Sequence, residues 1–140
     1  MIKTEQILQQ VNDLPVTGKS IVVGNSLVHL PSFVNTLTPQ FIHSVYTNNE
    51  LAYCVKFPDS TLRYASLWAA KEAVHMAVRQ MHKNKKLWWC DIEILRGRAQ
   101  PKPVVSIKKL KVPLELSLTI TDDGDYVWAL VMCLYDKGAV

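Results

Sequence analysis

The sequence lacks the features that mark a membrane protein, a disulfide-rich protein or a zinc protein. No apolar run approaches the roughly 18–20 residues that a membrane-spanning helix needs, and the longest, residues 126–135, has the length of a strand. Three cysteines, Cys54, Cys90 and Cys133, stand far apart with no Cys-x-x-Cys pair. They predict reduced thiols in a cytoplasmic protein. The first residues contain no basic segment leading into an apolar one, so we expect no secretory signal there.

The composition is that of a globular protein. Hydrophobic residues make up 49% of the 140 residues and charged residues 20%, which excludes a disordered chain. A chain of this length can bury a full core. There is no internal repeat or low-complexity tract, so we expect a single domain over residues 1–140.

The formal net charge is +4, and the cations gather in two clusters. The first comprises Arg79, His82, Lys83, Lys85 and Lys86; the second comprises Arg96, Arg98, Lys102, Lys108, Lys109 and Lys111. Such clusters favour acidic partners, although a solvated basic surface is an equal alternative on charge alone. The second cluster lacks the interleaved aromatic side chains on which bases stack, so we predict no nucleic-acid partner.

Local patterns predict several helices in the first two thirds of the chain. Residues 4–13 show apolar residues at helical spacing, and Pro31 suggests the start of another helix. Residues 47–50 have the Thr-x-x-Glu spacing of a capping box, which opens a helix that Pro58 should end. Residues 60–83 predict a long central helix, apolar around most of its circumference.

The strands are predicted from β-branched runs and from alternation. Residues 20–23 are a β-branched run typical of a buried strand. Residues 87–95 are strand-like, and 114–120 and 126–135 should pair as a hairpin. The element order α, β, α, α, β, β, β predicts an α+β fold, with helices packed on an antiparallel sheet.

Two adjacent charges, Lys71 and Glu72, interrupt the apolar middle of the long helix. Burying a charged side chain costs on the order of several kcal/mol unless the charge is paired or bound to a metal. The pair therefore either lies in water at a rim or has a function.

Four segments, in order, carry a family resemblance. Residues 24–33 (GNSLVHLPSF) are similar to the motif GIDLVEIPRF, and residues 46–54 (YTNNELAYC) to FTxxELxYC. Residues 68–73 (WAAKEA) and 89–94 (WCDIEI) match FAAKEA and WxDIEV. The ordered set resembles the holo-acyl-carrier-protein synthase branch of the 4′-phosphopantetheinyl transferases, over about residues 18–135.

The resemblance implies an α+β fold with an antiparallel sheet on a long central helix. It divides the chain into a helical extension, residues 1–17, and a holo-acyl-carrier-protein synthase-like domain, residues 18–135. It also implies a homotrimer whose active sites lie between subunits.

The activity implied by the resemblance is a transfer within fatty-acid or polyketide-type biosynthesis. Phosphopantetheine would pass from coenzyme A to a serine of an acyl carrier protein, with Mg²⁺ on the pyrophosphate. Glu72 would be a catalytic residue and the metal ligand; Lys71 would be catalytic and would bind the cofactor's phosphate. The basic clusters would suit an acidic carrier.

Several polar residues of the family's site are replaced. The metal-binding Asp of the opening motif is Ser26 here, or Asn25 in an alternative alignment that fits the neighbouring residues less well. Five further polar residues of the family are also replaced: Glu by His29, Arg by Ser32, a second Arg by Leu67, Lys by Met76 and His by Ile120.

The substitutions leave enzymatic activity open, with two alternatives. The first is a transferase with a remodelled site. The second is a non-catalytic relative that binds an acyl carrier protein or partner subunits of a biosynthetic complex. A third alternative, to which we give less weight, is a new acid/base site built from Ser26, His29 and Glu72.

Overall fold

A computed structural model describes residues 19–96, 102–110 and 114–136. The helices are α2 (Leu30–Phe33), α3 (Pro39–Val45), α4 (Asn48–Cys54) and α5 (Ser60–Met81), with 3₁₀ turns η1 (Val34–Thr36) and η2 (Trp89–Asp91). The strands are β1 (Lys19–His29), β2 (Ile92–Leu95), β3 (Val104–Ile107), β4 (Leu114–Asp123) and β5 (Tyr126–Asp136).

The main sheet has three antiparallel strands in the order β1-β5-β4. Strands β4 and β5 form a hairpin whose turn contains Gly124 at φ 58°, a left-handed conformation that glycine adopts without steric cost. β1 pairs with the other side of β5 along its whole length, from Lys19 opposite Asp136 to His29 opposite Tyr126. Strands β2 and β3 form a separate antiparallel pair.

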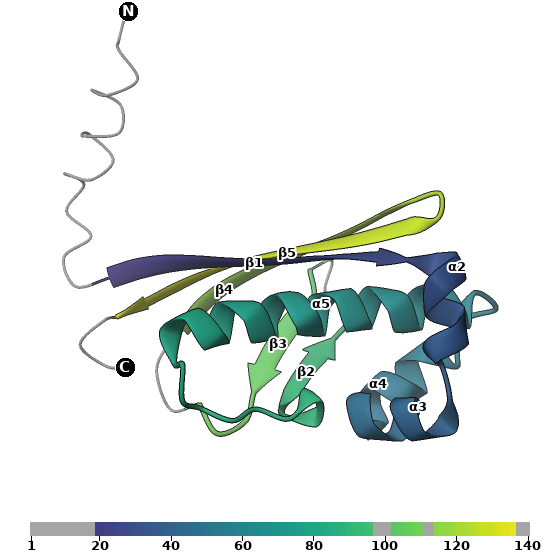
Figure 1. Ribbon diagram of the computed structural model, residues 1–140, viewed down its shortest axis with the longest axis horizontal. Coiled ribbons are helices and arrows are strands. Elements are labelled where there is room, and N and C mark those ends of the chain that lie inside the picture. The colour runs from purple at the N-terminus through teal and green to yellow at the C-terminus, as the bar shows by residue number, and fades with distance from the viewer. Residues whose placement is uncertain (1–18, 97–101, 111–113, 137–140) are drawn as a thin grey trace, which may run out of the picture.

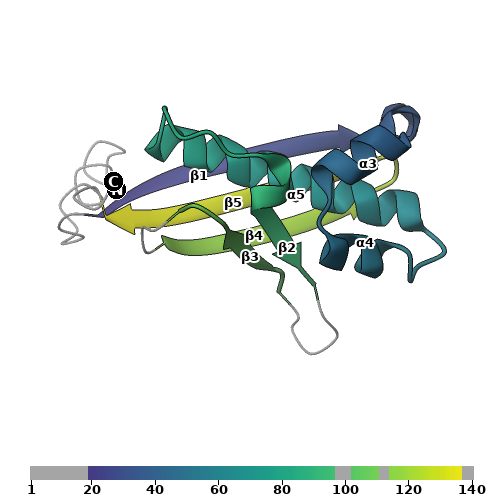
Figure 2. The ribbon, with the colours of Figure 1, turned by 90° about the horizontal axis from the view of Figure 1, so that it is seen from below.

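The long helix α5 lies along one face of the main sheet, and all the other helices are on that same side (Figure 1). Helices α2, α3 and α4 cluster at one end, while β2 packs against α5 (Figure 2). Helix α5 is therefore covered by the sheet on one side and by β2 and α4 on others. This explains why its apolar residues extend around most of its circumference: fully buried positions include Ala65, Leu67, Ala73 and Val74.

Most of the predicted architecture is confirmed. The α+β fold, the long helix and the terminal hairpin are all present. Helix α2 has Pro31 in its first turn. The capping box is complete: the Thr47 hydroxyl accepts from the Glu50 N–H, and the Glu50 carboxylate accepts from the Thr47 N–H.

Two expectations need correction, and two elements were missed. Residues 20–23 belong to a longer strand that is not buried, since Ile21 and Val23 lie on an uncovered face of the sheet. Residues 87–95 form a strand only over β2, because η2 precedes it. The sequence patterns missed β3 and α3. Met76, an apolar residue of α5, is exposed.

The predicted helix over residues 4–13 lies outside the described residues. Among the residues that are described, no helix combines the length and apolarity needed to cross a membrane.

Candidate functional site

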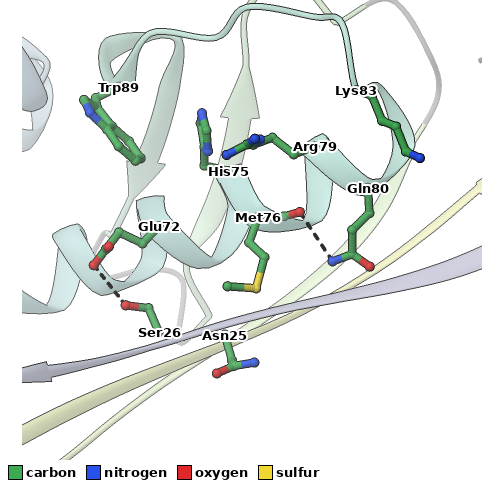
Figure 3. A pocket seen from close by; sticks show the side chains of 9 residues that line it. All are labelled: Asn25, Ser26, Glu72, His75, Met76, Arg79, Gln80, Lys83 and Trp89. Carbon is green, nitrogen blue, oxygen red and sulfur yellow. Dashed lines mark hydrogen bonds between the residues drawn. The ribbon is translucent and has the colours of Figure 1, made fainter.

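A pocket of about 720 Å³ opens between β1 and α5 (Figure 3). Its lining comprises Asn25, Ser26, Glu72, His75, Met76, Arg79, Gln80, Lys83 and Trp89. The five lining residues of α5 fall at i, i+3, i+4, i+7 and i+8, counted from Glu72. This spacing puts them on one helix face, and Lys83 follows just beyond the end of the helix.

The close approach of β1 to α5 depends on Gly24. A Cβ at this position would lie 1.9 Å from the carbonyl oxygen of Ala73. Only a residue without a side chain lets the strand lie this near the helix. Two residues further along β1, on the same face of the strand, Ser26 meets Glu72.

The acidic end of the pocket is the Ser26–Glu72 contact. The Ser26 hydroxyl donates a hydrogen bond of 3.0 Å to Oε1 of Glu72. Burial raises the pKa of the Glu72 carboxyl above its ordinary value, and the hydrogen bond from Ser26 offsets part of that rise. The carboxylate is thus partly desolvated and has one neutral donor beside it.

Residues 25 and 26 point to opposite sides of β1, as consecutive strand residues do. The Ser26 side chain faces Glu72, whereas the Asn25 side chain lies on the other side of the ribbon (Figure 3). The geometry therefore places Ser26, rather than Asn25, at the position next to the carboxylate.

The other end of the pocket is cationic. Arg79 follows Glu72 by seven residues, which corresponds to about 10 Å along the axis of α5, and Lys83 lies just beyond the end of the helix. His75 lies between the two ends. Burial lowers the pKa of His75, the Arg79 charge lowers it further, and a backbone hydrogen bond at Leu87 opposes the shift.

Lys71 does not line this pocket. Its side chain is fully buried and forms an ion pair of 2.8 Å with Oε1 of Glu50. Its Nζ also donates to the carbonyl oxygens of Trp89, at 2.9 Å, and of Ile92. The two adjacent charges of the sequence therefore have separate surroundings: Lys71 points into the protein and Glu72 into the pocket.

His29 also lies apart from the pocket. Its Nδ1 is 2.7 Å from the Ser32 hydroxyl, and its ring is 5.0 Å from that of Tyr126. An odd-numbered position in β1 faces away from Ser26. The structure therefore does not assemble Ser26, His29 and Glu72 into one acid/base site.

The donors beside Glu72 can be tested against the chemistry of Mg²⁺. Within residues 19–96, 102–110 and 114–136, no group of three or more His, Cys, Asp or Glu side chains could hold a metal ion. Mg²⁺ in proteins commonly takes one or two carboxylates plus oxygens of substrate phosphates. The Glu72 carboxylate with the Ser26 hydroxyl fits such a site, with one carboxylate in place of two.

The sequence patterns identified Glu72 but missed His75, Gln80 and Trp89. Helical spacing from Glu72 would have identified His75, which is one turn away, and Arg79, two turns away, was already noted in the first basic cluster. Trp89 had no such signal, because it belongs to η2 and reaches the pocket only through tertiary contacts.

Comparison with known proteins supplies a family match. The model of the 4′-phosphopantetheinyl transferase superfamily matches residues 23–131. The holo-[acyl-carrier-protein] synthase of Wolbachia pipientis is 28% identical over 122 residues, which cover 82% of this chain and 95% of that protein. That of Gloeobacter violaceus is 31% identical over 120 residues, covering 78% of this chain and 89% of that protein.

A larger protein contains a similar region. The fatty acid synthase alpha subunit hexA of Dothistroma septosporum is 31% identical over 101 residues, which span 72% of this chain and 31% of that protein.

Solved structures share the fold. The ACPS–CoA complex from Chronobacterium ammoniagenes superposes with a TM-score of 0.72 at 26% identity, covering 84% of this chain and 98% of that one. A holo-(acyl-carrier-protein) synthase from Bacillus anthracis in complex with CoA superposes with a TM-score of 0.66 at 21% identity, covering 81% of this chain and 96% of that one.

Proposed function

The chain belongs to the 4′-phosphopantetheinyl transferase superfamily, and we propose that it is a transferase of the holo-acyl-carrier-protein synthase type. It moves phosphopantetheine from coenzyme A to a serine of an acyl carrier protein in fatty-acid or polyketide-type biosynthesis. The observation that carries the proposal is the graded polarity of the pocket, with Glu72 at one end and Arg79 and Lys83 at the other.

That gradient suits coenzyme A, which carries phosphates at two separated places. Arg79 and Lys83 offer positive charge to phosphate oxygens, and Met76 and Trp89 supply apolar surface between the polar groups. Relatives with the same fold have been solved as complexes with CoA, which supports the same ligand here.

Glu72 is the proposed metal ligand and catalytic residue. Together with the Ser26 hydroxyl, it would hold Mg²⁺ against the pyrophosphate oxygens of the substrate. When bound, the metal neutralises charge on the phosphates during displacement. With one carboxylate, the protein alone would bind Mg²⁺ weakly, so we propose that the metal and coenzyme A bind together.

The remaining residues act by orientation and charge. Arg79 and Lys83 hold oxygens of the separate ribose phosphate, so that the pyrophosphate, where the phosphopantetheine bond is broken, lies at Glu72. His75, held with a lowered pKa, keeps a neutral imidazole in the pocket at pH 7. Lys71, which the sequence also nominated as a catalytic and phosphate-binding residue, has its donors engaged inside the protein, and we assign it no contact with coenzyme A.

We also propose that the protein is a homo-oligomer, a trimer as the family resemblance implies. The face of the main sheet opposite α5 carries exposed apolar side chains: Ile21, Val23, Leu27, Tyr126, Trp128 and Met132. We call this set the outer face. Leu27 is 63% exposed and Ile21 61%, and apolar patches of this kind mark association surfaces.

A second candidate is a non-catalytic relative that binds an acidic carrier protein. The observation in its favour is Ser26, because a hydroxyl occupies the position beside Glu72 where the family has a carboxylate. Basic surface around Lys83, Lys85 and Lys86 would attract the carrier in either case.

A transfer assay separates the two candidates. Purified protein is incubated with coenzyme A, Mg²⁺ and a panel of apo-carrier proteins, and each carrier is analysed by intact mass spectrometry. The transferase predicts a Mg²⁺-dependent phosphopantetheine adduct that Glu72→Gln abolishes. Salt-sensitive carrier binding without an adduct supports the second candidate. If the protein neither modifies nor binds any carrier, both candidates are wrong.

A further inference from the structure

Trp89 differs in origin from the rest of the pocket lining. All the other described lining residues come from β1 or from α5 and the residues that directly follow it, whereas Trp89 comes from η2. Its ring lies 4.7 Å from that of His75 and 4.7 Å from that of Trp68. It forms the wall across the pocket from Ser26 (Figure 3).

What holds this wall is a main-chain contact. Lys71 donates to the carbonyl oxygen of Trp89, at 2.9 Å, and to that of Ile92. These two carbonyls bracket η2, so a single ammonium group fixes both ends of the turn. Two contacts at opposite ends restrict both the position and the rotation of the turn, and with them the Trp89 ring.

The ammonium group is anchored in turn by Glu50. Its Oε1 accepts from Lys71 and from the Thr47 N–H, both at 2.8 Å, and its Oε2 accepts from the Ile94 N–H at 2.8 Å. Both side chains of the pair are fully buried. Helices α4 and α5, the turn η2 and strand β2 therefore meet in one hydrogen-bonded network.

This network accounts for all three N–H donors of Lys71 within the described residues. A buried ion pair contributes little net stability compared with apolar residues of similar size. It does fix relative positions, because each of its hydrogen bonds is directional. The buried charge is thus better explained by the placement of η2 than by stability alone.

We propose that Lys71 and Glu50 are positioning residues for the pocket. They hold the Trp89 wall through its main-chain carbonyl, and they set the affinity of the pocket for its ligand without touching that ligand. The inference rests on the proposed function only in the choice of coenzyme A as the probe.

A double-mutant cycle tests the proposal. Glu50→Gln/Lys71→Met removes both charges together, so that no unpaired charge is left buried. We expect this variant and Trp89→Leu each to weaken coenzyme A binding by about tenfold in calorimetry, the equivalent of one net hydrogen bond. The combined variant should bind no more weakly than Trp89→Leu alone, because both changes remove the same wall.

Additive losses would overturn the proposal, since they would indicate that Lys71 contacts the phosphates directly. Gly124→Ala is the matched control: it strains a turn far from the pocket and should leave the affinity unchanged. Loss of affinity in this control would show that reduced stability alone explains the result.

A second measurement needs no ligand and therefore survives failure of the proposed function. In protein labelled with 5-fluorotryptophan, the ¹⁹F resonance of Trp89 is assigned by its absence in Trp89→Leu. It should shift or broaden in Glu50→Gln/Lys71→Met, while that of Trp128 on the outer face should not. An unchanged Trp89 resonance would refute the positioning role.

If this charge-free variant does not fold, a second one, Glu50→Gln/Lys71→Leu, provides the same comparison. It also leaves no unpaired charge buried and removes the donors to the Trp89 and Ile92 carbonyls, so the Trp89 resonance should again shift, and an unchanged resonance counts against the proposal.

Discussion

The Ser26 hydroxyl donates a hydrogen bond of 3.0 Å to the Glu72 carboxylate, across the junction of β1 and α5. Two residues 46 positions apart are thereby brought together at the acidic end of the pocket. Under the proposed function, a carboxylate at position 26 would share a metal with Glu72, where the Ser26 hydroxyl offers only a neutral oxygen.

Ser26→Asp should strengthen Mg²⁺ binding in the presence of coenzyme A by at least about tenfold. The attraction between Mg²⁺ and a second carboxylate a few ångströms away is well above the roughly 1.4 kcal/mol that corresponds to a tenfold gain in affinity. Thermal shift during Mg²⁺ titration measures the effect. Asn25→Asp is the matched control, because its side chain lies on the other side of β1, and an equal gain from it would contradict the assignment.

Glu72→Gln should raise the melting temperature at pH 7 while abolishing the shift caused by Mg²⁺ and coenzyme A. The folded-state pKa of Glu72 lies above the unfolded value of 4.5, so ionisation in the native state reduces stability. The penalty is absent below pH 4.5 and grows as pH rises through the folded pKa. The difference between variant and wild type should therefore vanish in acid.

The control for this pH dependence is Glu115→Gln. The Glu115 side chain is 74% exposed in its ion pair with Lys19, so its removal should not produce a gain at pH 7. A melting-temperature difference for Glu72→Gln that is constant with pH would exclude the desolvated carboxylate as its cause.

Gly24→Ala should destabilise the fold by roughly 2–3 kcal/mol, because the new methyl group would collide with the Ala73 carbonyl and force β1 away from α5. Urea unfolding gives the value. Gly124→Ala separates crowding from backbone strain, since nothing lies within 4 Å of a Cβ there and only the positive φ is unfavourable. It should cost about 1 kcal/mol, and equal costs would contradict the crowding argument.

Leu27→Glu should dissociate the proposed oligomer, because it places a charge in the middle of the outer face, opposite Trp128. Size-exclusion chromatography with light scattering reports the mass. Gln40→Glu tests specificity, since Gln40 is an exposed residue of α3, on the other side of the sheet (Figure 1), and it should leave the mass unchanged. A wild-type protein that is monomeric at all concentrations would refute the oligomer.

Much of the fold was predictable because its signals are local. The capping box at Thr47, the helical period of α5 and the alternation in β4 and β5 each act over a few residues. The buried strand predicted at residues 20–23 was wrong because a β-branched run reports strand preference, not burial. Ile21 and Val23 point to a face of the sheet that the described residues leave exposed.

The site was predictable only in part, for a geometric reason. Lys71 and Glu72 are adjacent in sequence, and the sequence suggested one shared task. Consecutive helix residues point about 100° apart, so Lys71 reaches η2 and Glu50 while Glu72 reaches β1. Trp89 could not be found from local patterns, because its place depends on a contact with a residue 18 positions away.

The Glu50–Lys71 network has a consequence for the order of folding. Its contacts join segments that are 18 to 44 residues apart in the chain, whereas β1 pairs with β5 between residues as far apart as Lys19 and Asp136. Closing the shorter loops costs less entropy. We expect α4, α5, η2 and β2 to assemble first and β1 to join the sheet last, which would make the Ser26 side of the pocket the final part of the molecule to become native.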